Sequence, residues 1–290
     1  MIEFIKDYKH DEKLRRSFDA LAMQTFGISF EAWYQSGCWN ASYMPYSYEV
    51  DGKIVANASA NKMKLIIEGK PVDAIQIGTV MTDPEFRRRG LAYDLIQRII
   101  ADFEDDAEFF YLAADDEAMA LYRKCGFVDV PEVKYAWQNP LGSPESLKRT
   151  LVPASMTLEA LCTVKSSALL KGAKLEIVED EHILAFYWHH GFNEKLYRLD
   201  DMTVLIADIV DAGKGLVLYD VFVQNGGVAR FDLPNILART GATTVKFAFD
   251  VAGLITGLEK ECLDPSGWMV RSAGNSGFPA LFSYPKLAQA

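Results

Sequence analysis

The sequence has little cysteine and histidine, and neither is arranged as a metal site or a disulfide framework. Its four cysteines lie far apart and form no Cys-x-x-Cys pair. Two of the histidines, His189 and His190, are adjacent, so their side chains would diverge by about 100° on a helix and could not readily share a metal ion. We therefore predict no metal site, and reduced thiols as found in the cytoplasm.

Long apolar runs and an excess of positive charge are also missing. Nothing approaches the roughly 18 uninterrupted apolar residues of a membrane span, and charges are scattered through the first sixteen residues. The formal net charge is -10, which disfavours nucleic acid and favours cationic partners such as amines. These features predict a cytoplasmic protein that binds neither membranes nor nucleic acid.

The length of 290 residues, half of them hydrophobic, suggests two globular domains. Residues 139–155 carry prolines, glycine and serines without apolar periodicity, which is typical of a linker. We therefore expect one domain over residues 1–138 and a second over residues 156–290.

Strand and helix patterns alternate along the first half, which indicates the α/β (α+β) class. The clearest helix runs from Gly90 to Phe103, where apolar residues recur at a spacing of four. A buried strand and a short helix follow, and the helix ends at Gly126.

The stretch "DPEFRRRGLAYDLI", residues 83–96, joins a strand over residues 76–82 to this helix. The first amides of a helix lack intrahelical partners and lie at the positive end of its dipole, so the junction can bind an anion. Gly90 lets a phosphate approach the backbone, and the preceding arginines supply guanidinium donors. The pattern is Arg87-x-x-Gly90-x-Ala92, which is neither a Walker loop nor a dinucleotide-binding loop.

This segment resembles the pyrophosphate loop of the GNAT N-acetyltransferase superfamily. About thirty residues later, "LYRKCGF" resembles the second hallmark of that superfamily, a helical tyrosine followed by Gly-Phe. The resemblance covers residues 1–138 and implies a GNAT fold, with a mixed central sheet flanked by helices. It also implies acetyl-CoA as co-substrate and transfer of its acetyl group to a primary amine of a small molecule or peptide, by direct attack in a ternary complex.

The resemblance assigns roles residue by residue. The backbone of the splayed strand would bind the pantetheine arm, loop and helix residues would bind the pyrophosphate, and Tyr122 would protonate the leaving thiolate, for which a phenol is a suitable acid. The expected acetyl-CoA-binding residues are Val80, Met81, Thr82, Arg87, Arg88, Arg89, Gly90, Leu91, Ala92 and Tyr93.

Two features of the first half stay open at this stage. The strand before the loop has no acidic residue to act as base, and Asp73, Glu49 and Glu31 cannot be ranked for that role. The aromatic segment over residues 30–50 could form a cage for a cation or could pack against the second domain. The residues concerned are Trp33, Trp39, Tyr43 and Tyr46.

The second half also mixes strands and helices and could be a distant copy of the first. Its "FYWHHGF" repeats the spacing of the tyrosine motif but precedes the strands it should follow, and "QNGGVAR" replaces the arginine loop. We expect a degenerate GNAT-like domain, similar in arrangement to the enhanced-intracellular-survival group. It would wall the acceptor cleft or mediate homo-oligomerisation, and a non-catalytic acyl-CoA sensor or a structural tandem module remain alternatives to an enzyme.

Overall fold

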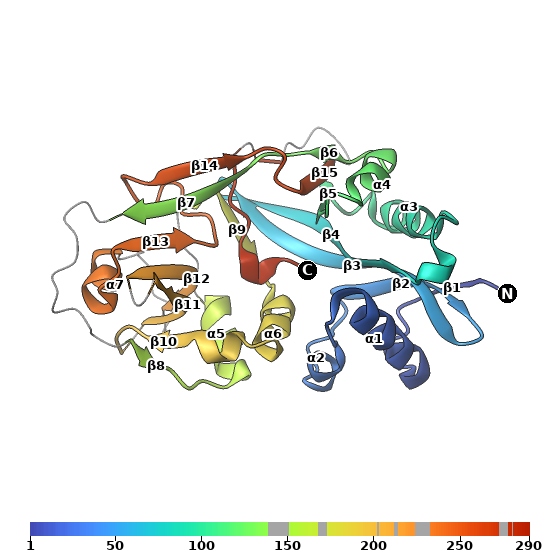
Figure 1. The fold of residues 1–290 in the computed structure, drawn as a ribbon, viewed down its shortest axis with the longest axis horizontal. Helices are drawn as coiled ribbons and strands as arrows, with labels where there is room; N and C mark the ends of the chain where they lie inside the picture. Colours follow the sequence, from blue (N-terminus) through green and yellow to red (C-terminus); the bar gives the residue numbers. More distant parts are fainter. Residues whose placement is uncertain are drawn as a thin grey trace.

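The computed structural model describes the chain except for residues 139–150, 168–172, 202, 212–213, 224–232, 273–277 and 280. Two mixed sheets lie side by side along the long axis, with the N-terminus at one end and Ala290 near the middle (Figure 1). No helix in the described ranges is long and apolar enough to cross a membrane. Most of the predicted linker, together with "QNGGVAR", lies outside the described residues.

The first sheet has the strand order β1-β2-β3-β4-β5-β15-β6, and β9 pairs with the end of β3. Its strands are β1 (Glu3–Lys6), β2 (Tyr43–Val50), β3 (Lys53–Ile67), β4 (Lys70–Thr82), β5 (Phe109–Ala113), β6 (Val128–Asp129), β9 (Leu175–Val178) and β15 (Trp268–Ser272). Neighbours run antiparallel except β4 and β5, which are parallel.

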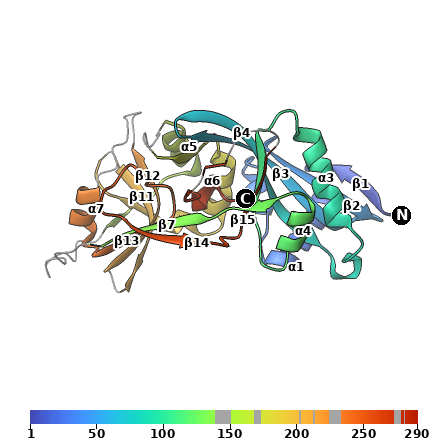
Figure 2. The same cartoon turned by 90° about the horizontal axis from the view of Figure 1, so that it is seen from above.

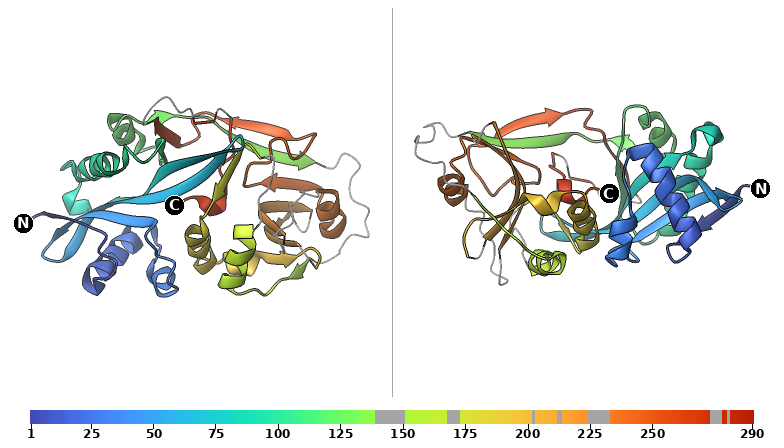
Figure 3. Two further views of the ribbon diagram at one scale, coloured as in Figure 1. Left: turned by 180° about the vertical axis from the view of Figure 1, so that it is seen from behind. Right: turned by 60° about the horizontal axis from the view of Figure 1, so that its bottom comes forward.

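Helices cover both faces of this sheet (Figures 1 and 3). On one face lie α1 (Glu12–Phe26) and α2 (Glu31–Gln35), and on the other lie α3 (Leu91–Phe103) and α4 (Met119–Lys124). The apolar face of α3 that the spacing of four predicts is buried against the sheet, with Leu95, Ile96 and Ile99 at 0% exposure. Asp11 caps α1 by accepting a hydrogen bond from the Leu14 amide at 3.1 Å.

The second sheet has the strand order β14-β7-β13-β12-β11-β10-β8. Its strands are β7 (Glu132–Gln138), β8 (Val152–Pro153), β10 (Leu196–Arg198), β11 (Thr203–Val210), β12 (Gly215–Val223), β13 (Thr244–Phe247) and β14 (Glu259–Leu263). Around it lie the helices α5 (Leu158–Ser167), α6 (Glu181–His189) and α7 (Leu233–Thr240). β8 falls inside the predicted linker.

The two sheets repeat one another and exchange their last strands. In the first, β15 lies between β5 and β6; in the second, β7 takes the matching place between β13 and β14. The fourth and fifth strands of each repeat, β4–β5 and β12–β13, form its parallel pair. Figures 1 and 2 show β7 extended alongside β14.

The repeat confirms the predicted class, a mixed α/β fold with two similar parts. The domain boundary after residue 138 stays a prediction. One strand from each side of it pairs in the other sheet: β7 lies before residue 138 and joins the second sheet, and β15 lies after it and joins the first. One helix has no counterpart, because residues 248–258, between β13 and β14, form turns where α4 stands in the first repeat.

Candidate functional site

The candidate site begins where β4 separates from β5. Parallel pairing between these strands runs only from Ala74 to Gln76 of β4, and the rest of β4 continues without β5 beside it. A bulge follows at once, because Met81 pairs with Asn57 and Gly78 with Ser59, which leaves two β4 residues opposite one of β3. The splayed strand expected for a pantetheine arm is therefore present.

A buried chain of hydroxyl and amide groups holds the bulge. Thr79, at the bulge, has a left-handed φ of 49°, which is rare for a β-branched residue and needs support from its surroundings. Its Oγ1 accepts a hydrogen bond from the Tyr43 hydroxyl at 2.9 Å, and its carbonyl accepts one from Asn57 Nδ2 at 2.8 Å. The chain continues across β3 and β2 through Ser59, Ser47 and Tyr8.

The loop after β4 is fixed by Asp83. One oxygen of this buried carboxylate accepts the Glu85 amide at 3.0 Å, and the other lies 2.6 Å from Lys53 Nζ. Those contacts lower the pKa of Asp83, the hydrogen bond from Lys53 being the largest cause. The loop is thereby held in one shape ahead of α3.

At the end of the loop, the backbone presents amides to a cleft. Gly90 has a φ of 79°, and a Cβ built on it would meet nothing within 4 Å. The left-handed backbone therefore favours glycine, and the space in front of it is open. The first hydrogen bond of α3 joins the Asp94 amide to the Gly90 carbonyl at 3.0 Å, so the amides of the preceding turn have no intrahelical partner.

A cavity of about 550 Å³ lies against this loop. Among the described residues that line it, several are basic and none carries a carboxyl group. Seven of the predicted residues line it: Thr82, Arg87, Arg88, Gly90, Leu91, Ala92 and Tyr93. Sequence reasoning missed three others: Phe86, Leu121 and Lys124.

The remaining predicted residues lie elsewhere. Arg89 turns back onto its own loop, donating to the Glu85 carbonyl at 2.9 Å and stacking 4.8 Å from the Phe86 ring centre. Met81 is 2% exposed and packs on the face of the sheet that carries α1. Val80 is half-buried at the bulge. The binding roles given to these residues stay predictions.

Tyr122 lies on α4, whose residues Leu121 and Lys124 line the cavity. The tyrosine is 5% exposed, packs near Phe127, and its hydroxyl makes no hydrogen bond to any described residue. Burial raises the pKa of Tyr122 far above its ordinary value, so the phenol keeps its proton at neutral pH. Its role as an acid stays a prediction.

A second, smaller cavity of about 40 Å³ lies on the other side of the bulge. Its wall is aromatic and apolar, except for Asn61 and Thr79. Asn61 is 0% exposed, and among the described residues its Oδ1 has no hydrogen-bond partner. Ala290 closes the cavity, with its amide donating to Gln76 Oε1 at 2.8 Å.

The aromatic segment packs together and against the second half. Trp33, Trp39 and Tyr43 are buried with ring centres 5.1–5.6 Å apart, and Phe186 of α6 contacts Trp33 at 6.0 Å. Tyr46 packs in a different cluster, and its hydroxyl donates to Asp102 at 2.7 Å. Of the two alternatives, packing against the second half is confirmed, and the four-residue cage is wrong.

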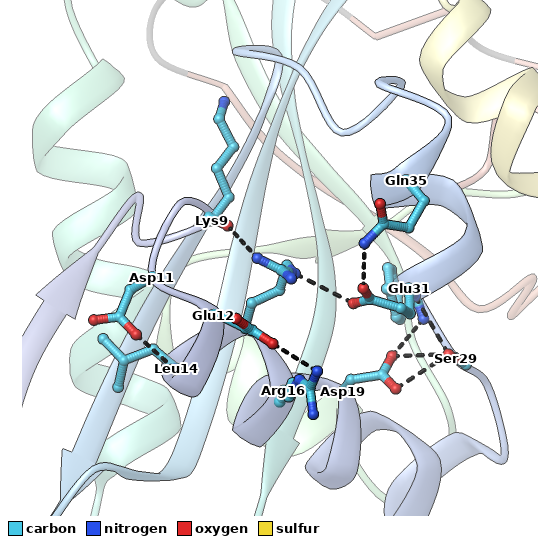
Figure 4. A network of polar contacts seen from close by, with 11 residues as sticks. Lys9, Asp11, Glu12, Leu14, Arg16, Asp19, Ser29, Glu31 and Gln35 are labelled. Carbon is cyan, nitrogen blue, oxygen red and sulfur yellow. Dashed lines mark hydrogen bonds and ion pairs between the residues drawn. The ribbon is translucent and has the colours of Figure 1, made fainter.

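None of the three carboxylates considered as a base reaches the site. Asp73 is exposed near the opposite end of β4, and Glu49 accepts the Gly52 amide in a hairpin turn. Glu31 is bound by Gln35 and by Arg15 at 3.2 Å, in the network that joins α1 to α2 (Figure 4). Hydrogen bonds from Gln35 and then Arg15 lower the pKa of Glu31.

The buried polar residues at the bulge, which sequence reasoning also missed, have a signal in "NASAN", residues 57–61. Asn57, Ser59 and Asn61 alternate along β3 and are all 0% exposed, although a buried strand face is normally apolar. Polar residues at a period of two in an otherwise apolar strand mark a buried polar face.

Comparison with known proteins agrees with this geometry. Residues 29–128 match the family model described as an acetyltransferase (GNAT) domain. No curated protein matches the chain. The matched residues include β2 to β5, the loop before α3, and Tyr122 on α4. They also include every residue of the first half that lines either cavity.

Solved structures resemble nearly the whole chain. Eis1 from Mycobacterium abscessus is 14% identical with a TM-score of 0.60, over 94% of this chain and 74% of its own. GCN5-related N-acetyltransferases from Anabaena variabilis and Kribbella flavida are 17% and 15% identical, each with a TM-score of 0.55, over 94% of this chain and 73% and 71% of theirs. Residues 29–128 thus match a GNAT domain, and the fold of nearly the whole chain is similar to that of Eis1.

Proposed function

We propose that this protein is an N-acetyltransferase that transfers the acetyl group of acetyl-CoA to a primary amine by direct attack in a ternary complex. One observation carries the proposal: the splayed end of β4 leads into a loop that lines a cavity of about 550 Å³ with basic residues and with the residues that begin α3. These two surfaces match acetyl-CoA: the loop suits its diphosphate, and the free end of β4 suits the extended arm joined to it.

The residues divide the binding between them. The amides that begin α3 would donate to the diphosphate, and Arg87, Arg88 and Lys124 would add positive charge. The β4 backbone from Val80 to Thr82 would bind the pantetheine arm through the hydrogen bonds that β5 does not take.

The acceptor would enter from the side of the small aromatic cavity. There the unpartnered Oδ1 of Asn61 is available to accept a hydrogen bond from the attacking nitrogen. The amine nitrogen attacks the acetyl carbonyl carbon, the carbon–sulfur bond breaks, and Tyr122 gives its proton to the departing thiolate. No carboxyl side chain of a described residue lines either cavity, so the base stays unassigned and the ammonium proton would pass to water.

Thiol release from acetyl-CoA with a panel of primary amines tests this function. Release that depends on one class of amine, with the acetylated amine found by mass spectrometry, supports a transferase. Binding of acetyl-CoA without turnover of any amine would instead indicate a sensor. A ligand at about 100 times its Kd contributes about 2.7 kcal/mol of stability, so an unchanged melting temperature would leave only a structural module.

A further inference from the structure

A separate cavity lies in the second half, where the repeat places the counterpart of the β4–β5 cleft. β12 pairs with β13 only up to Leu218, and a bulge at Tyr219 follows, since Ala207 pairs with Leu218 and Ile206 with Asp220. A cavity of about 320 Å³ begins directly beyond, against Asp220 and Phe222. β9, α5 and the start of α6 complete its wall.

The wall of this cavity is strongly acidic. Its one lining cation among the described residues is Lys165, and Lys174 interacts with the lining residue Asp250 from outside the wall. The lining carboxylates are Glu176, Glu179, Asp180, Glu181, Asp220 and Asp250. Lys64 also pairs with Glu179 at 2.9 Å from outside the wall. Three lysines therefore face six lining carboxylates, which leaves an excess of negative charge around the cavity.

Asp180 shows the imbalance most directly. It is 1% exposed, and within the described ranges its Oδ1 accepts no hydrogen bond. The Lys165 ammonium lies 3.1 Å from Asp180 Oδ2 and 3.6 Å from Asp220 Oδ2, so one cation is shared by two anions. A buried carboxylate with unused lone pairs facing a cavity is a strong acceptor for an entering N–H donor.

The shape of the site distinguishes an amine from a metal ion. In the described part of the chain, no group of three His, Cys, Asp or Glu side chains is placed to hold a metal ion. The carboxylates are spread around the cavity, and apolar side chains such as Leu175, Phe222 and Phe249 lie between them. Separated anions with apolar surface between them suit ammonium groups joined by methylene chains.

We propose that this cavity binds a linear aliphatic amine with two or more ammonium groups. Asp180, Asp220 and Glu176 accept the ammonium hydrogen bonds, and the apolar residues contact the methylene groups. The site is distinct from the acceptor side of the first half, where no described side chain that lines the cavity is a carboxylate. The proposal therefore does not depend on acetyl transfer.

Isothermal titration of the full chain with spermidine tests the site. We expect saturable binding, with no binding of the neutral probe 1,4-butanediol. Asp220→Asn keeps the oxygen that accepts the Val221 amide at 2.8 Å and removes the charge. It should weaken spermidine binding by about tenfold or more, as expected for loss of a charge-assisted hydrogen bond. The exposed Asp105→Asn makes the same charge change elsewhere and should bind like the wild type.

Two further variants keep the outcome decisive. Glu176→Gln tests the same wall at a less buried position, should Asp220→Asn disturb folding. Gly90→Glu, which blocks the loop of the first half, should leave spermidine binding unchanged even if acetyl transfer is lost. Wild-type affinity in both Asp220→Asn and Glu176→Gln, equal binding of magnesium ion, or no saturation by spermidine would overturn the proposal.

Discussion

The indole nitrogen of Trp33 donates a hydrogen bond of 2.6 Å to the main-chain oxygen of His182. This contact joins α2 of the first half to α6 of the second, 149 residues away in the chain. The same helix α6 contributes Ile183 and Phe186 to the small cavity beside the bulge. The second half therefore forms part of the wall of the small cavity that we propose as the acceptor side.

Gly90 offers a direct test of the loop. Gly90→Glu places a side chain and a negative charge in the space where the diphosphate would lie, so acetyl-CoA binding should be lost in calorimetry. Gly27 is a matched control, since it also has a left-handed φ, 69°, and open space around its Cβ, but ends α1. Both substitutions should cost about 1 kcal/mol of stability, and only the first should abolish binding. Unaltered acetyl-CoA affinity in Gly90→Glu would contradict the loop as the diphosphate-binding site.

Tyr122→Phe tests the acid. The hydroxyl has no described partner, so its removal should leave the melting temperature nearly unchanged while kcat falls by about 10²-fold, the usual contribution of a general acid. The loss of kcat in Tyr122→Phe should be smallest with an acyl donor whose leaving group is a weaker base than the CoA thiolate, because that group needs no proton. Tyr46→Phe, which loses a partly buried hydrogen bond to Asp102, serves as control and should keep full turnover. Equal kcat in both variants would remove Tyr122 from the mechanism.

The sequence predicts the local parts of this site better than their assembly. Leu91, Leu95 and Ile99 predict α3, and the arginines before Gly90 predict an anion site, because both signals lie within one short segment. The exchange of β7 and β15 leaves no such signal: "VKYAW" indicates a strand, yet periodicity does not say which sheet it joins. The hydrogen bond from Trp33 to His182 likewise depends on packing between the two halves, which no short segment of sequence indicates.

Glu176 should make stability depend on pH. Burial raises its pKa to about 7 in the folded protein from an ordinary 4.5, so folding favours the protonated form. The unfolded chain releases this proton first as pH rises, so stability falls between about pH 4.5 and 7 and is level above. The free energy of unfolding of Glu176→Gln should equal that of the wild type near pH 4. Near pH 8 it should be higher, by only about 1–2 kcal/mol because solvent screens this partly exposed group. Urea unfolding at both pH values measures this, with exposed Glu159→Gln as control; parallel curves for all three proteins would contradict it.

The strand exchange predicts that residues 1–138 do not fold alone. Without β15, the outer edge of β5 is unpaired, and the positions of Trp268, Met269 and Val270, at most 5% exposed, are empty. The fragment should aggregate or melt without cooperativity in calorimetry. A matched chimera, with residues 266–272 joined directly after Pro131, restores the missing strand: the Val130 amide already donates to the Trp268 carbonyl at 3.0 Å, so the connection is short. The chimera should melt cooperatively as a monomer. If the plain fragment melts as sharply as the chimera, β15 contributes nothing essential and the boundary after residue 138 is a true domain boundary.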